Sequence, residues 1–122
     1  MILECKVGVR VSFYKDDIAI IELSGELSIF SEGFELLSKE LNAYIKMGIY
    51  KYILLMERLR YIDSSGVGLL IRISSFAAKK NTKVCLICHQ PNILKILNIS
   101  KVDIFFKPVE SVDEAISYFE NV

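Results

Sequence analysis

The residues with the clearest potential for chemistry lie in one short stretch, YIDSSGVGLL, residues 61–70. A carboxylate followed by two hydroxyls and two glycines can cap a helix, supply a nucleophile, or present a serine for modification. Asp63 or Ser64 can cap a helix by accepting a hydrogen bond from its free N–H groups. A cap does not explain Gly66 and Gly68, because glycine in a first helical turn costs about 0.5–1 kcal/mol relative to alanine. Glycines without a Cβ would let another backbone or another protein lie close to the helix start.

A hydrolytic serine is the second interpretation, and the sequence gives it little support. The nucleophile elbow G-x-S-x-G needs a glycine two residues before the serine, where this chain has Ile62. A catalytic triad would also need a base, and His89 is the only histidine of the chain. Gly66-Val67-Gly68 is not a phosphate-binding loop, since no G-K-[ST] follows it. The sequence therefore predicts neither an enzyme nor a cofactor.

Phosphorylation of Ser64 is the third interpretation. A phosphate there adds nearly two negative charges at a helix N-terminus, where free N–H groups and the helix dipole tolerate an anion. A partner docked over Gly66 and Gly68 would instead meet an unpaired charge in a desolvated interface. The modification would be neutral for folding and decisive for binding, as a switch requires.

The elements that position this stretch follow from periodicity and from capping signals. Val7, Val9, Val11 and Phe13 alternate with small or polar residues, which is typical of a strand. The later elements are a turn at 15–17, a strand at 18–24, a helix from about Ser31 ending before Gly48, a buried strand at 51–56, a helix beginning at the Asp63-Ser64 stretch, a strand at 83–88, a helix opened by Pro91, a strand at 104–108, and a helix capped by Ser111 and Glu114.

Strand–helix alternation after an initial hairpin indicates an α/β fold. We expect a single domain over residues 1–122, with a mixed, mostly parallel β-sheet, an N-terminal antiparallel hairpin, and about four helices covering the sheet. In the helix after Ser64, the spacing predicts a buried face made of Val67, Leu70, Ile71, Ser74 and Ala78. Asp63 and Ser64 would then lie at the C-terminal end of a central strand, where α/β sheets gather their functional groups.

Composition narrows the classes of function. The 122 residues contain 15 basic and 15 acidic side chains, without the basic stripe that nucleic-acid binding requires. No apolar run is long enough to cross a bilayer, and the first residues lack the features of an export signal. Three cysteines without such a signal predict reduced thiols in a cytoplasmic protein.

Two of the cysteines form a misleading motif. Cys85-Leu86-Ile87-Cys88-His89 fits C-x-x-C-H, the pattern of c-type haem attachment. The segment has the composition of a strand, in which a spacing of three points the two thiols to opposite faces. We therefore expect Cys85 in the core, His89 in a solvent-facing loop, and no metal or haem site. Cys5 is the only other cysteine.

Three segments carry a resemblance to a known family. IDSSGVGLL resembles the signature of the STAS domain family of anti-sigma factor antagonists. In that signature an aspartate and a serine come first, the third position is serine, threonine or alanine, and a glycine and then Leu-Gly or a close variant follow. IAIIELSGEL is similar to the family's second strand, and ILKILNISKVDIFFKPVESVDEAI to its tail. The segments occur in the family's order between about Ile18 and Ile116.

The resemblance implies a switched binding module. Ser64 would be phosphorylated by a partner that is both an anti-sigma factor and a GHKL-type serine kinase, and a PP2C-type phosphatase would restore it. The unphosphorylated form would hold the kinase and the phosphorylated form would release it. No direct nucleic-acid contact or membrane insertion is implied. Of the two neighbouring rings of Phe105 and Phe106, one is expected in the core, and the other can support weak self-association. The residues expected at the partner surface are Asp63, Ser64, Ser65, Gly66, Val67, Gly68 and Ser28.

The chain departs from the family pattern at two positions. Ser28 stands where an aspartate usually follows Gly-Glu-Leu, and Leu55-Met56 where the family commonly has Asp-Leu. Both changes remove acidic groups that can bear on kinase recognition. The alternative is a STAS scaffold of a signalling complex, or a cytoplasmic subunit of a lipid transporter, that binds constitutively and has no phosphorylation cycle.

Overall fold

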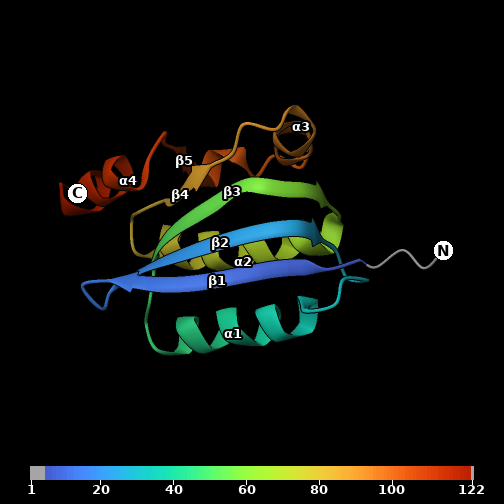
Figure 1. Cartoon of the computed structure of the whole chain (residues 1–122). Helices are drawn as coiled ribbons and strands as arrows, with labels where there is room; N and C mark the ends of the chain where they lie inside the picture. Colours follow the sequence, from blue (N-terminus) through green and yellow to red (C-terminus); the bar gives the residue numbers. More distant parts are fainter. Residues whose placement is uncertain (1–4, 122) are drawn as a thin grey trace.

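The computed structural model describes residues 5–121 and contains five strands and four α-helices in the predicted order (Figure 1). Residues 1–4, which belong to the stretch interpreted as lacking an export signal, lie outside the described residues, as does residue 122. The elements are β1 (Val7–Tyr14), β2 (Ile18–Leu27), α1 (Phe34–Lys46), β3 (Lys51–Ile62), α2 (Ser64–Lys79), β4 (Val84–Ile87), α3 (Pro91–Ile99), the short 3₁₀ helix η1 (Asp103–Phe105), β5 (Phe106–Pro108) and α4 (Val112–Glu120).

The strands form one sheet in the order β1-β2-β3-β4-β5. β1 and β2 are antiparallel, with Tyr14 opposite Ile18, and the other neighbouring pairs are parallel. Lys15 and Asp16 both have positive φ, and the Asp17 N–H reaches the Tyr14 carbonyl at 3.4 Å, so residues 15–17 form a tight three-residue hairpin loop. The predicted hairpin and the mostly parallel sheet are confirmed.

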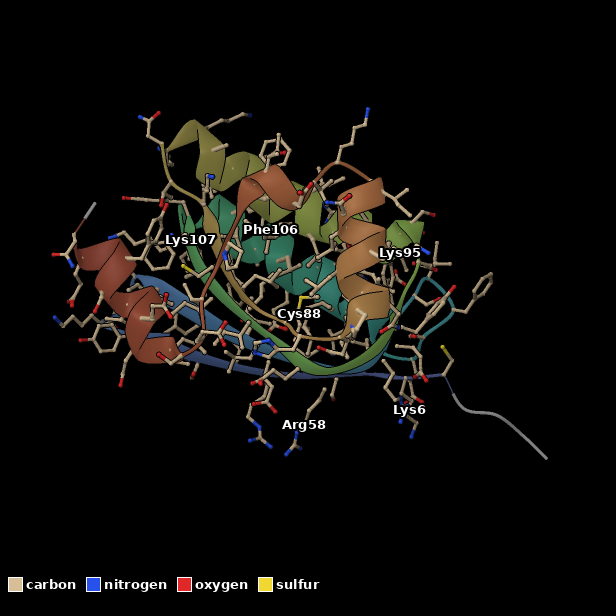
Figure 2. The ribbon with its side chains drawn as sticks, turned by 90° about the horizontal axis from the view of Figure 1, so that it is seen from above. Lys6, Arg58, Cys88, Lys95, Phe106 and Lys107 are labelled. Atoms are coloured by element: carbon tan, nitrogen blue, oxygen red, sulfur yellow. The ribbon has the colours of Figure 1, made fainter. Side chains whose placement is uncertain are left out.

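Alternation along the strands divides the apolar side chains between two cores. The major core contains Leu54, Leu86 and Cys88 from the sheet side and packs against α1, α2 and α3. The minor core contains Ile53 and Cys85, and α4 covers it with Ala115 and Phe119. Cys85 and Cys88 therefore face opposite sides of the sheet, as predicted from their spacing. Figure 2 shows Arg58 projecting from the sheet on the side away from α1 and α2.

Several predicted boundaries need correction. α1 begins at Phe34 rather than near Ser31, because Ser31 is buried in a turn and Gly33 has a φ of 93°. The last strand is shorter than predicted, since residues 103–105 form η1. In α2 the buried face includes Leu69, Ile73 and Ala77, whereas Ile71 and Ala78 are exposed. No helix in the described range is long and apolar enough to cross a membrane.

The central strand is twice as long as predicted. The sequence indicated a strand over residues 51–56, but β3 continues to Ile62 through a segment rich in charge. It stays paired with β2 as far as Leu27 opposite Ile62, with register shifts that accommodate the extra residues. Leu59 and Ile62 are buried, so apolar side chains still anchor this charged half.

The second half of β3 extends beyond β4, which pairs only with Ile53–Leu55. There the side-chain amide of Gln90 donates hydrogen bonds to the carbonyl oxygens of Met56, at 2.6 Å, and of Leu59. Asn92 donates to the carbonyl of Arg60 at 3.0 Å. These side chains take the place of a neighbouring strand and keep β3 extended up to the residue before Asp63.

Replacing Gln90 tests this support. Gln90→Ala would leave the carbonyl groups of two buried residues, Met56 and Leu59, without a donor. A buried polar group without a partner costs about 1–3 kcal/mol, so we expect the free energy of unfolding to fall by that amount. Urea denaturation followed by circular dichroism measures it. Asn92→Ala is the control, with an expected loss below about 1 kcal/mol because that site is exposed. Equal midpoints for Gln90→Ala and the unmodified chain would contradict the assigned role.

Candidate functional site

The candidate site is the junction between β3 and α2, at the C-terminal edge of the parallel strands. Asp63 has an extended backbone and is the N-cap of α2, and its Oδ1 accepts a hydrogen bond from the Gly66 N–H at 2.8 Å. Ser64 is the first residue of α2 and is exposed. The first turn of α2 contains no acidic residue. The hydroxyl of Ser64 is therefore accessible at a helix end that carries partial positive charge.

The second carboxylate oxygen of Asp63 binds a different segment. Its Oδ2 accepts hydrogen bonds from the Ser28 hydroxyl at 2.8 Å and from the Ile29 N–H at 3.1 Å. The Phe30 N–H in turn donates to the Ser28 hydroxyl oxygen at 3.2 Å. One side chain thus joins the start of α2 to the loop between β2 and α1. We call this set of bonds the Asp63 clasp.

Two opposing effects act on the pKa of Asp63. Burial raises the pKa, but the hydrogen bonds from Gly66, Ser28 and Ile29 favour the ionised carboxylate and bring the net pKa below its ordinary value. Because both oxygens accept bonds from the fold, Asp63 is committed to structure. It orients the helix start, and with it the Ser64 hydroxyl.

The two glycines of the motif have different surroundings. A Cβ on Gly66 would collide with the carbonyl oxygen of Leu27 and with the Ile62 side chain, so the close approach of β2 requires this glycine. A Cβ on Gly68 would meet no atom within 4 Å. The close approach predicted from the sequence is internal at Gly66, whereas at Gly68 the fold gives no reason for a glycine.

The expected partner-surface residues divide by exposure. Three are buried, namely Ser28 at 3% exposure, Gly66 and Val67. They can affect a partner only through the residues that they position. Ser64 and Gly68 are exposed, and Asp63 and Ser65 are partly exposed.

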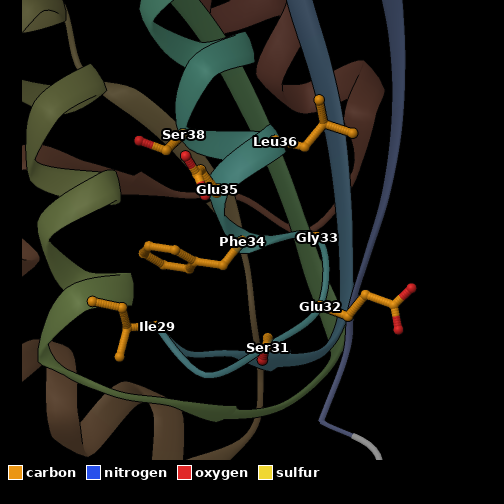
Figure 3. Close-up of a pocket in the computed structure, with 8 residues that line it drawn as sticks. All are labelled: Ile29, Ser31, Glu32, Gly33, Phe34, Glu35, Leu36 and Ser38. Atoms are coloured by element: carbon orange, nitrogen blue, oxygen red, sulfur yellow. The ribbon is translucent and has the colours of Figure 1, made fainter.

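Sequence reasoning missed two neighbours of the site, Ile29 and Phe30. Their side chains are exposed, and both backbone N–H groups belong to the Asp63 clasp. The signal was available, since two large apolar residues directly follow Gly-Glu-Leu-Ser in a segment between two elements. A shallow groove of 660 Å³ begins at Ile29 and continues along the first turns of α1 (Figure 3). Figure 3 shows Ile29 and Phe34 on the side toward α2, with Glu32 and Leu36 directed the other way.

The other chemistry-bearing residues lie elsewhere. His89 is exposed in the loop after β4, with its Nε2 at 3.5 Å from Glu110 Oε2 and 4.0 Å from Glu57 Oε2. These two glutamates belong to β3 and to the segment before α4, not to the junction that carries Ser64. Burial raises the pKa of the Cys85 thiol to about 12, so this core cysteine is a poor nucleophile. No three His, Cys, Asp or Glu residues within the described range could hold a metal ion.

Leu55 also lies away from the site. It is in the middle of β3, and the eight residues to Asp63 correspond to roughly 25 Å of extended strand. The position that lacks the family's acidic residue was expected near the end of the strand, but the strand is longer than predicted. Of the two departures, only Ser28 belongs to the neighbourhood of Ser64.

Replacing Asp63 tests the clasp. Asp63→Asn keeps the shape but exchanges one acceptor oxygen for a donor amide, so either the Gly66 N–H or the donors from Ser28 and Ile29 lose their acceptor. We expect the free energy of unfolding at pH 7 to fall by about 1–3 kcal/mol. Because folding lowers the pKa of Asp63, its contribution is present above the unfolded-state value and is lost as the pH falls through the folded-state value.

Urea denaturation at pH 7 and at about pH 3 measures both effects. The difference between the unmodified chain and Asp63→Asn should shrink in acid. Asp103→Asn, on the exposed η1, is the control and should change little at either pH. A difference that stays constant or grows in acid would contradict the assigned role of the carboxylate.

Comparisons with known proteins agree with this architecture. The family model of the STAS domain matches residues 14–115. Among solved structures, an anti-sigma factor antagonist from Mycobacterium paratuberculosis superposes with a TM-score of 0.77 at 14% identity, covering 96% of this chain and 97% of that one. The Bacillus cell fate determinant SpoIIAA in its phosphorylated form gives a TM-score of 0.70 at 23% identity, with coverages of 90% and 97%. SpoIIAA in its unphosphorylated form gives 0.74 at 21% identity, with coverages of 94% and 100%. The exposed serine of the Asp-Ser-Ser-Gly motif thus lies in a sheet and helix arrangement shared with these proteins, and the chain belongs to the STAS domain family.

Proposed function

We propose that this chain is an anti-sigma factor antagonist, a binding module rather than an enzyme. In this function the unphosphorylated chain sequesters an anti-sigma factor that is also a GHKL-type serine kinase, and phosphorylation of Ser64 releases it. The observation that carries the proposal is the exposed Ser64 hydroxyl at the first residue of α2, directly after the Asp63 cap. Family membership and the solved relatives named as anti-sigma factor antagonists support it.

The phosphoryl transfer needs only an accessible hydroxyl from this chain. The Ser64 oxygen forms a bond to the γ-phosphorus of ATP, the bond from that phosphorus to the bridging oxygen breaks, and ADP leaves. The hydroxyl proton goes to a base of the kinase, because both Asp63 oxygens already accept hydrogen bonds within the fold. A PP2C-type phosphatase would hydrolyse the phosphoserine and restore the hydroxyl.

The same phosphate has opposite consequences for folding and for binding. At the start of α2 it lies at the positive end of the helix dipole, and the adjacent Asp63 carboxylate has both oxygens engaged in hydrogen bonds within the fold. In a partner interface over Ser64 and Gly68 it would be a desolvated charge without a designed counter-ion. Release of the partner therefore needs no unfolding of the antagonist.

One observation favours the alternative, a constitutively binding STAS scaffold or transporter subunit. Ser28 replaces the family's usual aspartate, and it is buried with its hydroxyl committed to Asp63. An acidic group is therefore missing directly beneath the surface that a kinase would recognise. Without a phosphorylation cycle, the same surface would hold its partner permanently.

Incubation with the cognate kinase and labelled ATP distinguishes the two functions. We expect stoichiometric labelling of the unmodified chain and no labelling of Ser64→Ala, because that variant lacks the acceptor oxygen. Ser65→Ala, which changes the partly exposed neighbouring hydroxyl, is the matched control and should retain labelling. Label that persists in Ser64→Ala would exclude the assigned acceptor. Partner binding without labelling of any variant would favour the scaffold.

The two glycines give a second test, in which stability and binding separate. Gly66→Ala should lower the free energy of unfolding by about 1–3 kcal/mol, because the added methyl collides with Leu27 and Ile62. Gly68→Ala should leave stability unchanged or raise it by about 0.5–1 kcal/mol, since the methyl enters open space and favours helix.

For partner affinity we expect Gly68→Ala to weaken binding about tenfold, equivalent to about 1.4 kcal/mol, because a methyl group would hold the docked surface away from α2. Isothermal titration calorimetry with the unphosphorylated variant measures this loss. Gly68→Ala that binds as tightly as the unmodified chain would remove Gly68 from the interface.

A further inference from the structure

Two adjacent apolar side chains beside the site are exposed and belong to neither core cluster of the described residues. Phe30 is the most exposed large apolar side chain of the described residues, at 85%, and Ile29 is 57% exposed. Singly exposed apolar residues are common and need no explanation. A Phe and an Ile side by side in a short loop form a convex apolar projection, which we call the Ile29–Phe30 knob.

The knob is presented on a fixed backbone. The Ile29 N–H binds Asp63 Oδ2, and the Phe30 N–H binds the buried Ser28 hydroxyl. The Ser31 N–H donates to the Ser28 carbonyl at 2.9 Å, which closes a turn around the two residues. Ser31 is itself buried, and its hydroxyl donates to the Glu26 carbonyl. A rigid aromatic side chain on such a loop loses little conformational entropy on binding, as interface anchors require.

The knob and Ser64 belong to one surface. The Asp63 carboxylate binds the loop through Ile29 and caps the helix whose first residue is Ser64. Figure 3 shows the Ile29 side chain on the side of the loop toward α2. A macromolecule whose active site reaches the Ser64 oxygen would therefore contact the Ile29–Phe30 knob as well.

The charges around the knob identify the kind of surface that would cover it. Glu35 is exposed beyond the knob, at the start of α1, and the ionised, partly exposed Asp63 lies on its other side. Lys39 pairs with Glu35 at 3.6 Å on an exposed helix face, where the pair adds little. A kinase carries Mg²⁺ and basic side chains around the phosphates of ATP, so its active-site rim complements this acidic border.

A second copy of this chain complements the knob poorly. In a two-fold contact the knob would face the same patch of its mate, and Glu35 and Asp63 of both copies would gather around it. Two apolar side chains also bury far less than the roughly 1,200 Å² of a stable interface. We propose that the Ile29–Phe30 knob inserts into an apolar pocket bordering the cationic, ATP-binding site of the serine kinase that acts on Ser64. The proposal rests on the proposed function and adds the contact that holds the kinase in place.

Photocrosslinking identifies the occupant directly. The photoreactive residue p-benzoylphenylalanine is placed at position 30, or at the control position 47, in the full chain carrying Ser64→Ala, and irradiated in a lysate of the source organism. Met47 is a suitable control because it is 72% exposed and lies at the opposite end of α1. We expect an adduct at position 30 but not at 47, with peptides from a protein that contains an ATP-binding kinase domain.

The captured kinase is then purified and titrated with unphosphorylated variants. Phe30→Ala should weaken its binding at least tenfold, whereas Met47→Ala should change it less than twofold. Thermal unfolding of both variants should match the unmodified chain, because neither side chain is buried. If a kinase labels Ser64 but binds Phe30→Ala with unchanged affinity, the docking proposal is wrong and the proposed function still stands.

Two other outcomes also overturn the proposal. A kinase-free sample that forms a dimer by analytical ultracentrifugation, and loses it in Phe30→Ala, would assign the knob to self-association. Absence of any kinase that labels Ser64 would remove the proposed function, and the docking proposal with it.

Discussion

The site depends on one carboxylate that accepts hydrogen bonds from two separate segments. Asp63 caps α2 through Gly66 and holds the loop between β2 and α1 through Ser28 and Ile29. A charged acceptor makes such bonds stronger than neutral ones, and the lowered pKa of Asp63 is the electrostatic sign of the same preference. Because the clasp is internal, the adjacent hydroxyl of Ser64 is left to solvent. Asp63 therefore has the structural role, and its neighbour Ser64 has the proposed signalling role.

This division of roles explains how a modification can change binding without changing the fold. The first turn of α2 has a buried side, where Gly66 admits the Leu27 carbonyl and Val67 enters the major core. Its other side carries Ser64 and Gly68, whose surroundings are open. A charge added on the open side meets water and the positive end of the helix dipole, whereas a protein docked there would have to desolvate it. The Ile29–Phe30 knob adds apolar contact area next to this electrostatic control.

Much of this architecture could be predicted from the sequence because local signals and global fold agree. The turn at Lys15 and Asp16, the cap at Ser111 and the strand–helix alternation each have a short-range cause. The full length of β3 was missed because its second half is rich in charge, and its support comes from Gln90, about thirty residues later in the chain. The start of α1 was missed because Glu32 pairs with the backbone of Cys5 and Val7 and Gly33 has a positive φ, so the helix begins only at Phe34. The motif predicted a cap at Asp63 or Ser64, and the cap is Asp63. Its bond to Ser28 depends on the meeting of two loops, which no local pattern encodes.

The central claim is that the start of α2 accepts a phosphate on Ser64 without loss of the fold. It can be measured without a kinase, by genetic incorporation of phosphoserine at position 64 and comparison of the melting temperature with that of the unmodified chain. For a domain of this size 1 kcal/mol corresponds to roughly 3–5 °C, so tolerance predicts a melting temperature within about 3 °C of the unmodified value. A fall of more than about 10 °C would mean that the phosphate disrupts the Asp63 clasp, and would contradict the separation of folding from switching.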